Sequence, residues 1–82
     1  MSSFYQARVE TDFGVYRAMM LDGAMIGFTE DGVDGLIDIV EIEEVDQVKS
    51  SPEWLLELLC SYVYERRRGE TITSATLTRR DA

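Results

Sequence analysis

One segment of this sequence, and only one, carries the start and stop signals of an α-helix. Ser50-Ser51-Pro52-Glu53 offers a capping box from Ser50 to Glu53, or an N-cap at Ser51 with proline at the first helical position. Three arginines (Arg66, Arg67 and Arg68) then suit the negative end of the helix dipole, and Gly69 provides a stop. The helix is predicted at about 51–68. With a single helix available, its apolar face must be buried against a sheet.

The segments around this helix have the alternation or the β-branched composition of strands. We expect strands at 4–11, 15–21, 24–29 and 36–45, and a threonine-rich edge strand at 71–79. Asp22-Gly23 is a hairpin signal, because both positions of a type I′ turn need positive φ. The 82 residues therefore form one α+β domain, 1–82, in which a small antiparallel sheet of four to five strands (order β-β-β-β-α-β) packs against one amphipathic helix.

The fourth predicted strand is the least regular, because Ile39 and Val40 are adjacent apolar residues and interrupt the alternation of apolar and polar side chains. A bulge at that point would turn four apolar side chains inward and three acidic ones outward: Ile37, Ile39, Val40 and Ile42 against Asp38, Glu41 and Glu43. A helix through this segment is the weaker alternative, because its apolar positions drift around a 3.6-residue repeat.

The predicted helix has an apolar arc and an acidic stripe on its opposite side. The arc contains Leu55, Leu56, Leu58, Leu59, Tyr62 and Val63, and the stripe contains Glu53, Glu57, Ser61 and Glu65. Two aromatic residues, Trp54 and Tyr64, fall within or beside the stripe. Either Trp54 folds back onto the rim of the core and Tyr64 stacks on an arginine stem, or the two form a contact patch for a partner.

Charge is the strongest compositional signal. Sixteen acidic residues against eight basic ones give a net charge of −8, and residues 18–48 contain no Lys or Arg. This segment is a solvated face, a docking surface for a basic protein, or a Ca²⁺ site of Asp31, Asp34 and Asp38, whose spacing does not match a calcium loop. The docking interpretation excludes nucleic acid and anionic membranes as direct partners. Its candidate partner-binding residues are Glu30, Asp31, Asp34, Asp38, Glu41, Glu43, Glu44, Asp46, Trp54 and Tyr64.

Catalysis finds little support in the sequence. There is no histidine, and no nucleophile–base pair or phosphate-binding loop, so we expect no enzyme, no cofactor and no metal. Cys60 lies at the edge of the apolar arc without a basic neighbour, which predicts an inert thiol. A lone cysteine, no signal-like N-terminal segment and no apolar run near the ~20 residues of a membrane span favour a cytoplasmic protein.

In size, acidity and lack of a cofactor, the chain resembles small phage-encoded inhibitors, including anti-CRISPR proteins and DNA mimics; the likeness is one of composition. The resemblance implies an inhibitor or regulator whose acidic face occupies a basic, often nucleic-acid-binding, surface of a target protein. Outward residues of a strand repeat every ~6.6 Å, so Glu41 and Glu43 could imitate successive phosphates. The alternative is a structural homo-oligomer, such as a homodimer, or a small accessory subunit that pairs through the edge strand or the helix.

Overall fold

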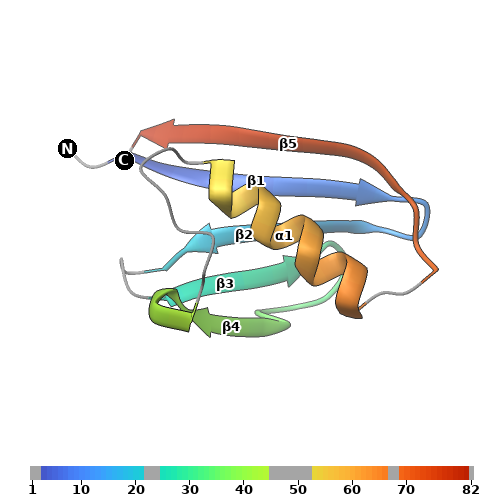
Figure 1. The fold of residues 1–82 in the computed structure, drawn as a ribbon, viewed down its shortest axis with the longest axis horizontal. Helices are drawn as coiled ribbons and strands as arrows, with labels where there is room; N and C mark the ends of the chain where they lie inside the picture. The colour runs from blue at the N-terminus through green and yellow to red at the C-terminus, as the bar shows by residue number, and fades with distance from the viewer. Residues whose placement is uncertain (1–2, 22–24, 45–52, 67–68, 82) are drawn as a thin grey trace.

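The computed structural model describes residues 3–21, 25–44, 53–66 and 69–81. Five strands form one antiparallel sheet in the spatial order β4-β3-β2-β1-β5, and the helix α1 crosses one face of it diagonally (Figure 1). The predicted α+β fold is thereby confirmed. The elements are β1 (Ser3–Thr11), β2 (Val15–Met20), β3 (Met25–Glu30), β4 (Asp38–Glu41), a 3₁₀ helix (Ile42–Glu44), α1 (Glu53–Arg66) and β5 (Ile72–Asp81).

The first four strands form a meander, and the fifth returns to the first. β1, β2 and β3 each pair with the next strand in the sequence, whereas α1 carries the chain back across the sheet so that β5 pairs with β1. The register runs from Ser3 opposite Asp81 to Glu10 opposite Ser74, and it shifts between Glu10 and Thr11. The first and last strands of the chain are thus neighbours in the sheet (Figure 1).

The core lies between α1 and the sheet face beneath it. Leu55, Leu59 and Val63 recur every four residues and so form one stripe along α1. They are buried in one cluster with alternate residues of the three central strands: Ala7, Val9, Tyr16, Ala18, Ile26 and Phe28. Tyr62 of α1 stacks on Phe28 with ring centroids 4.4 Å apart and planes 13° from parallel, a contact that contributes about 0.5–1.5 kcal/mol beyond burial.

One end of the sheet is held by side-chain hydrogen bonds to the backbone. The Thr11 hydroxyl accepts hydrogen bonds from the amides of Phe13 and Gly14, which closes the predicted turn between β1 and β2. The Asp12 amide donates to the Thr71 carbonyl at 3.1 Å, and the Thr71 amide donates to Asp12 Oδ1 at 2.8 Å. This reciprocal pair ties the turn to the start of β5.

The fourth strand is shorter than predicted, and its bulge is absent from the described pairing. β4 keeps one unbroken register with β3, from Met25 opposite Glu41 to Phe28 opposite Asp38. Asp38 therefore shares the face of the buried Phe28, and Ile39 points to the helix-free face, where it is 47% exposed. The prediction of Ile39 inward and Asp38 outward was wrong because the phase slip is resolved differently: the strand ends at Glu41, and the 3₁₀ helix brings Ile42 back against the core.

The described part of α1, Glu53–Arg66, lies within the range predicted for the helix. Gly69 has a φ of 92°, a left-handed conformation that favours glycine, and it follows the helix as the predicted stop. The capping residues Ser50, Ser51 and Pro52, the turn Asp22-Gly23, and Arg67 and Arg68 of the predicted helix end lie outside the described residues.

Two leucine truncations test this packing. Leu59→Ala removes a fully buried side chain beneath α1, and we expect the free energy of unfolding to fall by about 2–5 kcal/mol. Leu36→Ala makes the same change at a leucine that is 43% exposed, so the loss should be no more than about 1 kcal/mol. Urea denaturation of both variants provides the comparison, and equal losses would contradict the placement of α1.

Candidate functional site

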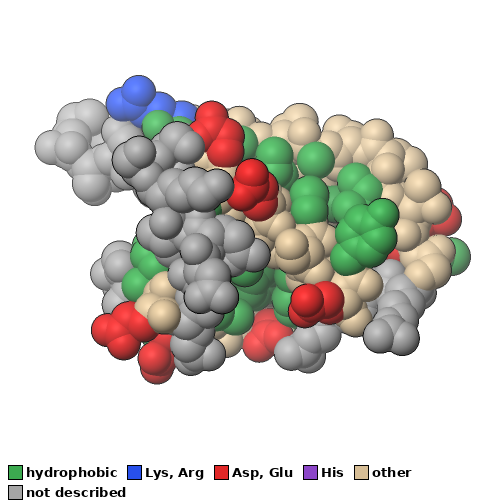
Figure 2. Space-filling model, in the orientation of Figure 1, with side chains coloured by type: hydrophobic (Ala, Val, Ile, Leu, Met, Phe, Trp, Pro, Cys, Tyr) green, Lys and Arg blue, Asp and Glu red, His purple; other side chains and the backbone are tan. Residues whose placement is uncertain are grey.

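The candidate carboxylates gather along the β4 margin of the sheet. Asp31 and Asp34 lie in the loop before β4, Asp38 and Glu41 lie in the strand, and Glu43 lies in the 3₁₀ helix that follows; we call these five residues the acidic edge. On the face shown in Figure 2, carboxylate side chains lie at the lower left, over the end of β4 and the 3₁₀ helix, and others lie along the lower margin and over α1. Lys and Arg side chains in view lie at the opposite margin, by the end of β5.

Members of the acidic edge differ in whether their carboxylates already have a partner within the chain. Asp31 forms an ion pair with Arg17, and Asp38 Oδ1 accepts a hydrogen bond from the Ile39 amide at 2.8 Å. Asp34, Glu41 and Glu43 are exposed, and no ion pair or hydrogen bond joins their side chains to another residue in the part of the chain that is described. Their negative charge therefore faces solvent.

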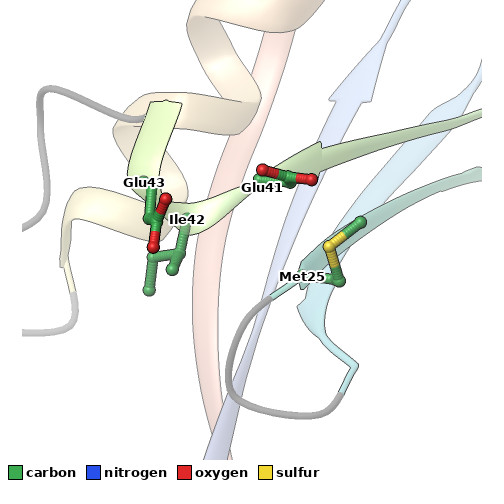
Figure 3. Close-up of a pocket in the computed structure, with 4 residues that line it drawn as sticks. All are labelled: Met25, Glu41, Ile42 and Glu43. Atoms are coloured by element: carbon green, nitrogen blue, oxygen red, sulfur yellow. The ribbon is translucent and has the colours of Figure 1, made fainter.

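Glu41 and Glu43 line an open pocket of about 270 Å³ together with Met25 and Ile42. Met25 extends from the start of β3, while the other three side chains come from the end of β4 and the turn after it (Figure 3). The pocket combines two carboxylates with a thioether and an aliphatic side chain. This combination suits a ligand that has an apolar stem and a cationic head.

Three further candidate carboxylates lie outside the acidic edge as defined above. Glu30 is the last residue of β3 and is half-buried. For Glu44 the structure describes the backbone alone, and Asp46 lies outside the described residues. The predicted phosphate-like spacing of Glu41 and Glu43 does not hold, because Glu41 ends the strand and Glu43 belongs to a 3₁₀ helix with a rise of only ~2.0 Å per residue.

The two displaced aromatic residues of α1 behave differently. Trp54 is half-buried and packs against the core, which is the packing role considered for it. Tyr64 is 74% exposed on the outer side of the helix, where a contact role remains a prediction. The structure thus does not bring the two rings together as one exposed patch.

An apolar patch on the helix-free face of the sheet was missed by the sequence reasoning. Met19, Gly27 and Ile39 lie side by side across β2, β3 and β4. Leu21 and Leu36 cover Gly27 so closely that an added Cβ would meet Leu36 Cδ2 at 2.9 Å. The available signal was the nearly unbroken apolar composition of 18–21 and 24–28, which indicates burial on both faces of a strand.

A tyrosine–carboxylate pair was also missed. The buried Tyr16 hydroxyl donates to Glu70 Oε1 at 2.7 Å, and Glu70 Oε2 is buried without a hydrogen-bond partner among the described residues. Because 54 positions separate the two residues, no local pattern could have indicated the contact. It anchors the segment between α1 and β5 on the sheet.

Cys60 lies on the half-buried side of α1. Burial, and then the negative charge of Glu57, raise the pKa of the Cys60 thiol above its usual 9.0. The thiolate is the reactive form, so its fraction at neutral pH is smaller than in a solvated cysteine. This agrees with the prediction of an inert thiol.

Comparisons with protein-family models, with curated proteins and with solved structures found no match to this chain. Among the described residues, no three or more Cys, Asp or Glu side chains are grouped so that they could hold a metal ion. No helix in the same part of the chain has the length and apolar character needed to cross a membrane.

Truncation of each displaced aromatic residue should separate packing from exposure. We expect Trp54→Ala to lower the free energy of unfolding by roughly 2–4 kcal/mol, because its ring packs on the core. Tyr64→Ala should change it by no more than about 0.5 kcal/mol, since that ring is exposed. Thermal and urea unfolding measure both changes. If Trp54→Ala left the free energy of unfolding unchanged, the packing role would be wrong and Trp54 would again be a candidate partner contact.

The raised pKa of Cys60 predicts slow alkylation and a pH-dependent stability. The native protein should react with iodoacetamide more slowly than the unfolded chain at pH 8, with a rate midpoint above 9.0. Because the folded state disfavours the thiolate, its contribution to stability is present below pH 9.0 and is lost as the pH rises above that value.

Glu57→Gln removes the negative charge that is the second cause of the raised Cys60 pKa. It should therefore move the pH midpoint of alkylation part of the way back toward 9.0. Glu65→Gln makes the same change farther along α1 and is the matched control. A midpoint that responds equally to both variants would contradict the assignment to Glu57.

Proposed function

We propose that this protein is a non-enzymatic binding module whose acidic edge docks on a basic surface of a target protein, where it acts as an inhibitor or regulator. The observation that carries the proposal is the placement of the solvent-facing carboxylates Asp34, Glu41 and Glu43 along one margin of the sheet. A net charge of −8 attracts basic surfaces at long range, and repels nucleic acids and anionic membranes.

The pocket beside β4 supplies the short-range part of this recognition. An arginine or lysine of the partner would lay its aliphatic stem on Met25 and Ile42 and set its cationic head between Glu41 and Glu43. Long-range charge raises the rate at which the two proteins meet, whereas a pocket that holds one side chain of the partner fixes the orientation of the complex.

Charge-neutral variants of matched net charge test the proposal. Glu41→Gln with Glu43→Gln changes the net charge from −8 to −6, and so does Glu57→Gln with Glu65→Gln on α1. For a fluorescent oligo-arginine peptide, we expect the first double variant to weaken binding by ~5–30-fold, from about 0.5–1 kcal/mol per lost ion pair. The second should weaken it by less than ~3-fold, because it acts only through screened long-range charge.

Fluorescence anisotropy at low and at physiological salt measures both dissociation constants. The same two variants, used as bait in nuclease-treated lysate, show whether a captured protein depends on the acidic edge. Equal losses for the two double variants would mean that net charge, and not the acidic edge, governs binding.

A structural role, as a homo-oligomer or an accessory subunit, is the second candidate. The observation that favours it is on the other side of the sheet, where β5 forms a long open edge. The two functions use opposite margins and do not exclude each other.

A further inference from the structure

The two edges of the sheet are protected to very different degrees. β4 has four residues, is flanked by the acidic edge and gives way to a 3₁₀ helix. β5 has ten residues and forms the other margin, and no described element lies beyond it (Figure 1). An open edge presents unpaired backbone amides and carbonyls, which are a template for another strand.

The usual protecting features are missing along most of β5. Its residues 72–78 contain no charge and no proline, and its side chains are mostly small and polar. The register shift against β1 lies at the beginning of this stretch, and Arg79 follows its end. Natural edge strands are normally interrupted by charges, prolines or bulges, so the middle of β5 is unusually open to pairing.

We infer that β5 pairs antiparallel with β5 of a second copy of this chain, about a two-fold axis near Ala75, to form one continuous ten-stranded sheet. Ala75 is the central residue of the uncharged stretch and is exposed. This surface is independent of the acidic edge; the inference rests on the second candidate function above and specifies how two copies would pair.

The distribution of charge makes β5 the margin at which a second copy of this chain approaches with the least repulsion. Two chains of net charge −8 repel each other, and their closest approach is least costly where their carboxylates are farthest apart. Pairing through β5 places the two β4 strands nine strand spacings apart, or about 43 Å, far beyond the ~8 Å screening length at physiological salt. Any face-to-face or β4-mediated arrangement would bring the acidic edges or the acidic stripes of α1 closer together.

A charge swap at Ala75 tests the arrangement. Near a two-fold axis each residue lies close to its own copy, so Ala75→Lys and Ala75→Glu should each raise the dimer dissociation constant by at least ~10-fold through like-charge contact. An equimolar mixture of the two variants should form a heterodimer with the affinity of the natural chain or better. Ser61→Lys and Ser61→Glu, at an exposed position on α1, make the same charge changes as controls and should leave the constant within ~3-fold.

Sedimentation velocity over a concentration series measures these constants, with circular dichroism to verify that each variant is folded. Hydrogen exchange of the natural chain needs no variant: amides of β5 should become protected as concentration rises, and amides of α1 should not. The inference is overturned if the natural chain remains a monomer to its solubility limit, if it dimerises without protecting β5, or if the charge-swapped mixture stays monomeric.

Discussion

The contact between α1 and the centre of the sheet is the interaction on which the remaining structure depends, because α1 is the layer that covers the sheet in the part of the chain that is described. Ala7 and Ala18 are opposite each other in β1 and β2, and their small side chains leave room for the leucines of the helix. Leu59 and the Tyr62–Phe28 stack then join the helix to three adjacent strands. Among the described residues, nine buried apolar side chains form the core, so each carries a large share of the stability.

A single covering helix leaves one face and two edges of the sheet to be stabilised by other means. On the helix-free face, Leu21 and Leu36 close over Gly27, and Arg8 and Arg17 are both ion-paired, to Glu10 and Asp31. At the β4 margin, short length and negative charge discourage strand addition. The β5 margin has neither feature. The proposed target surface and the proposed second copy are thus assigned to opposite margins by the same uneven distribution of charge.

The sequence predicted those features that local physics determines. The succession of strands and helix along the chain, the apolar arc of the helix and its glycine stop follow from periodicity and backbone preference, which act over a few neighbouring residues. The segment from Ile37 to Ile42 was misjudged, since a phase slip can be resolved by a bulge or by ending the strand, and only the contacts of Ile42 with the core decide between them. The Tyr16–Glu70 pair and the pocket beside β4 depend on residues brought together by the complete fold, so local patterns carry no information about them.

The placement of β1 between β2 and β5 has a consequence for the order in which the molecule assembles. The meander from β1 to β4 requires only neighbouring segments, but the partner on the other side of β1 is the last strand of the sheet, with Ser3 opposite Asp81. Pairings between such distant residues form late, because a long loop must close first. Until then, β1 is the margin of an unfinished sheet. Unlike the middle of β5, it carries Arg8 and Glu10, and charges on a strand margin disfavour pairing with another strand.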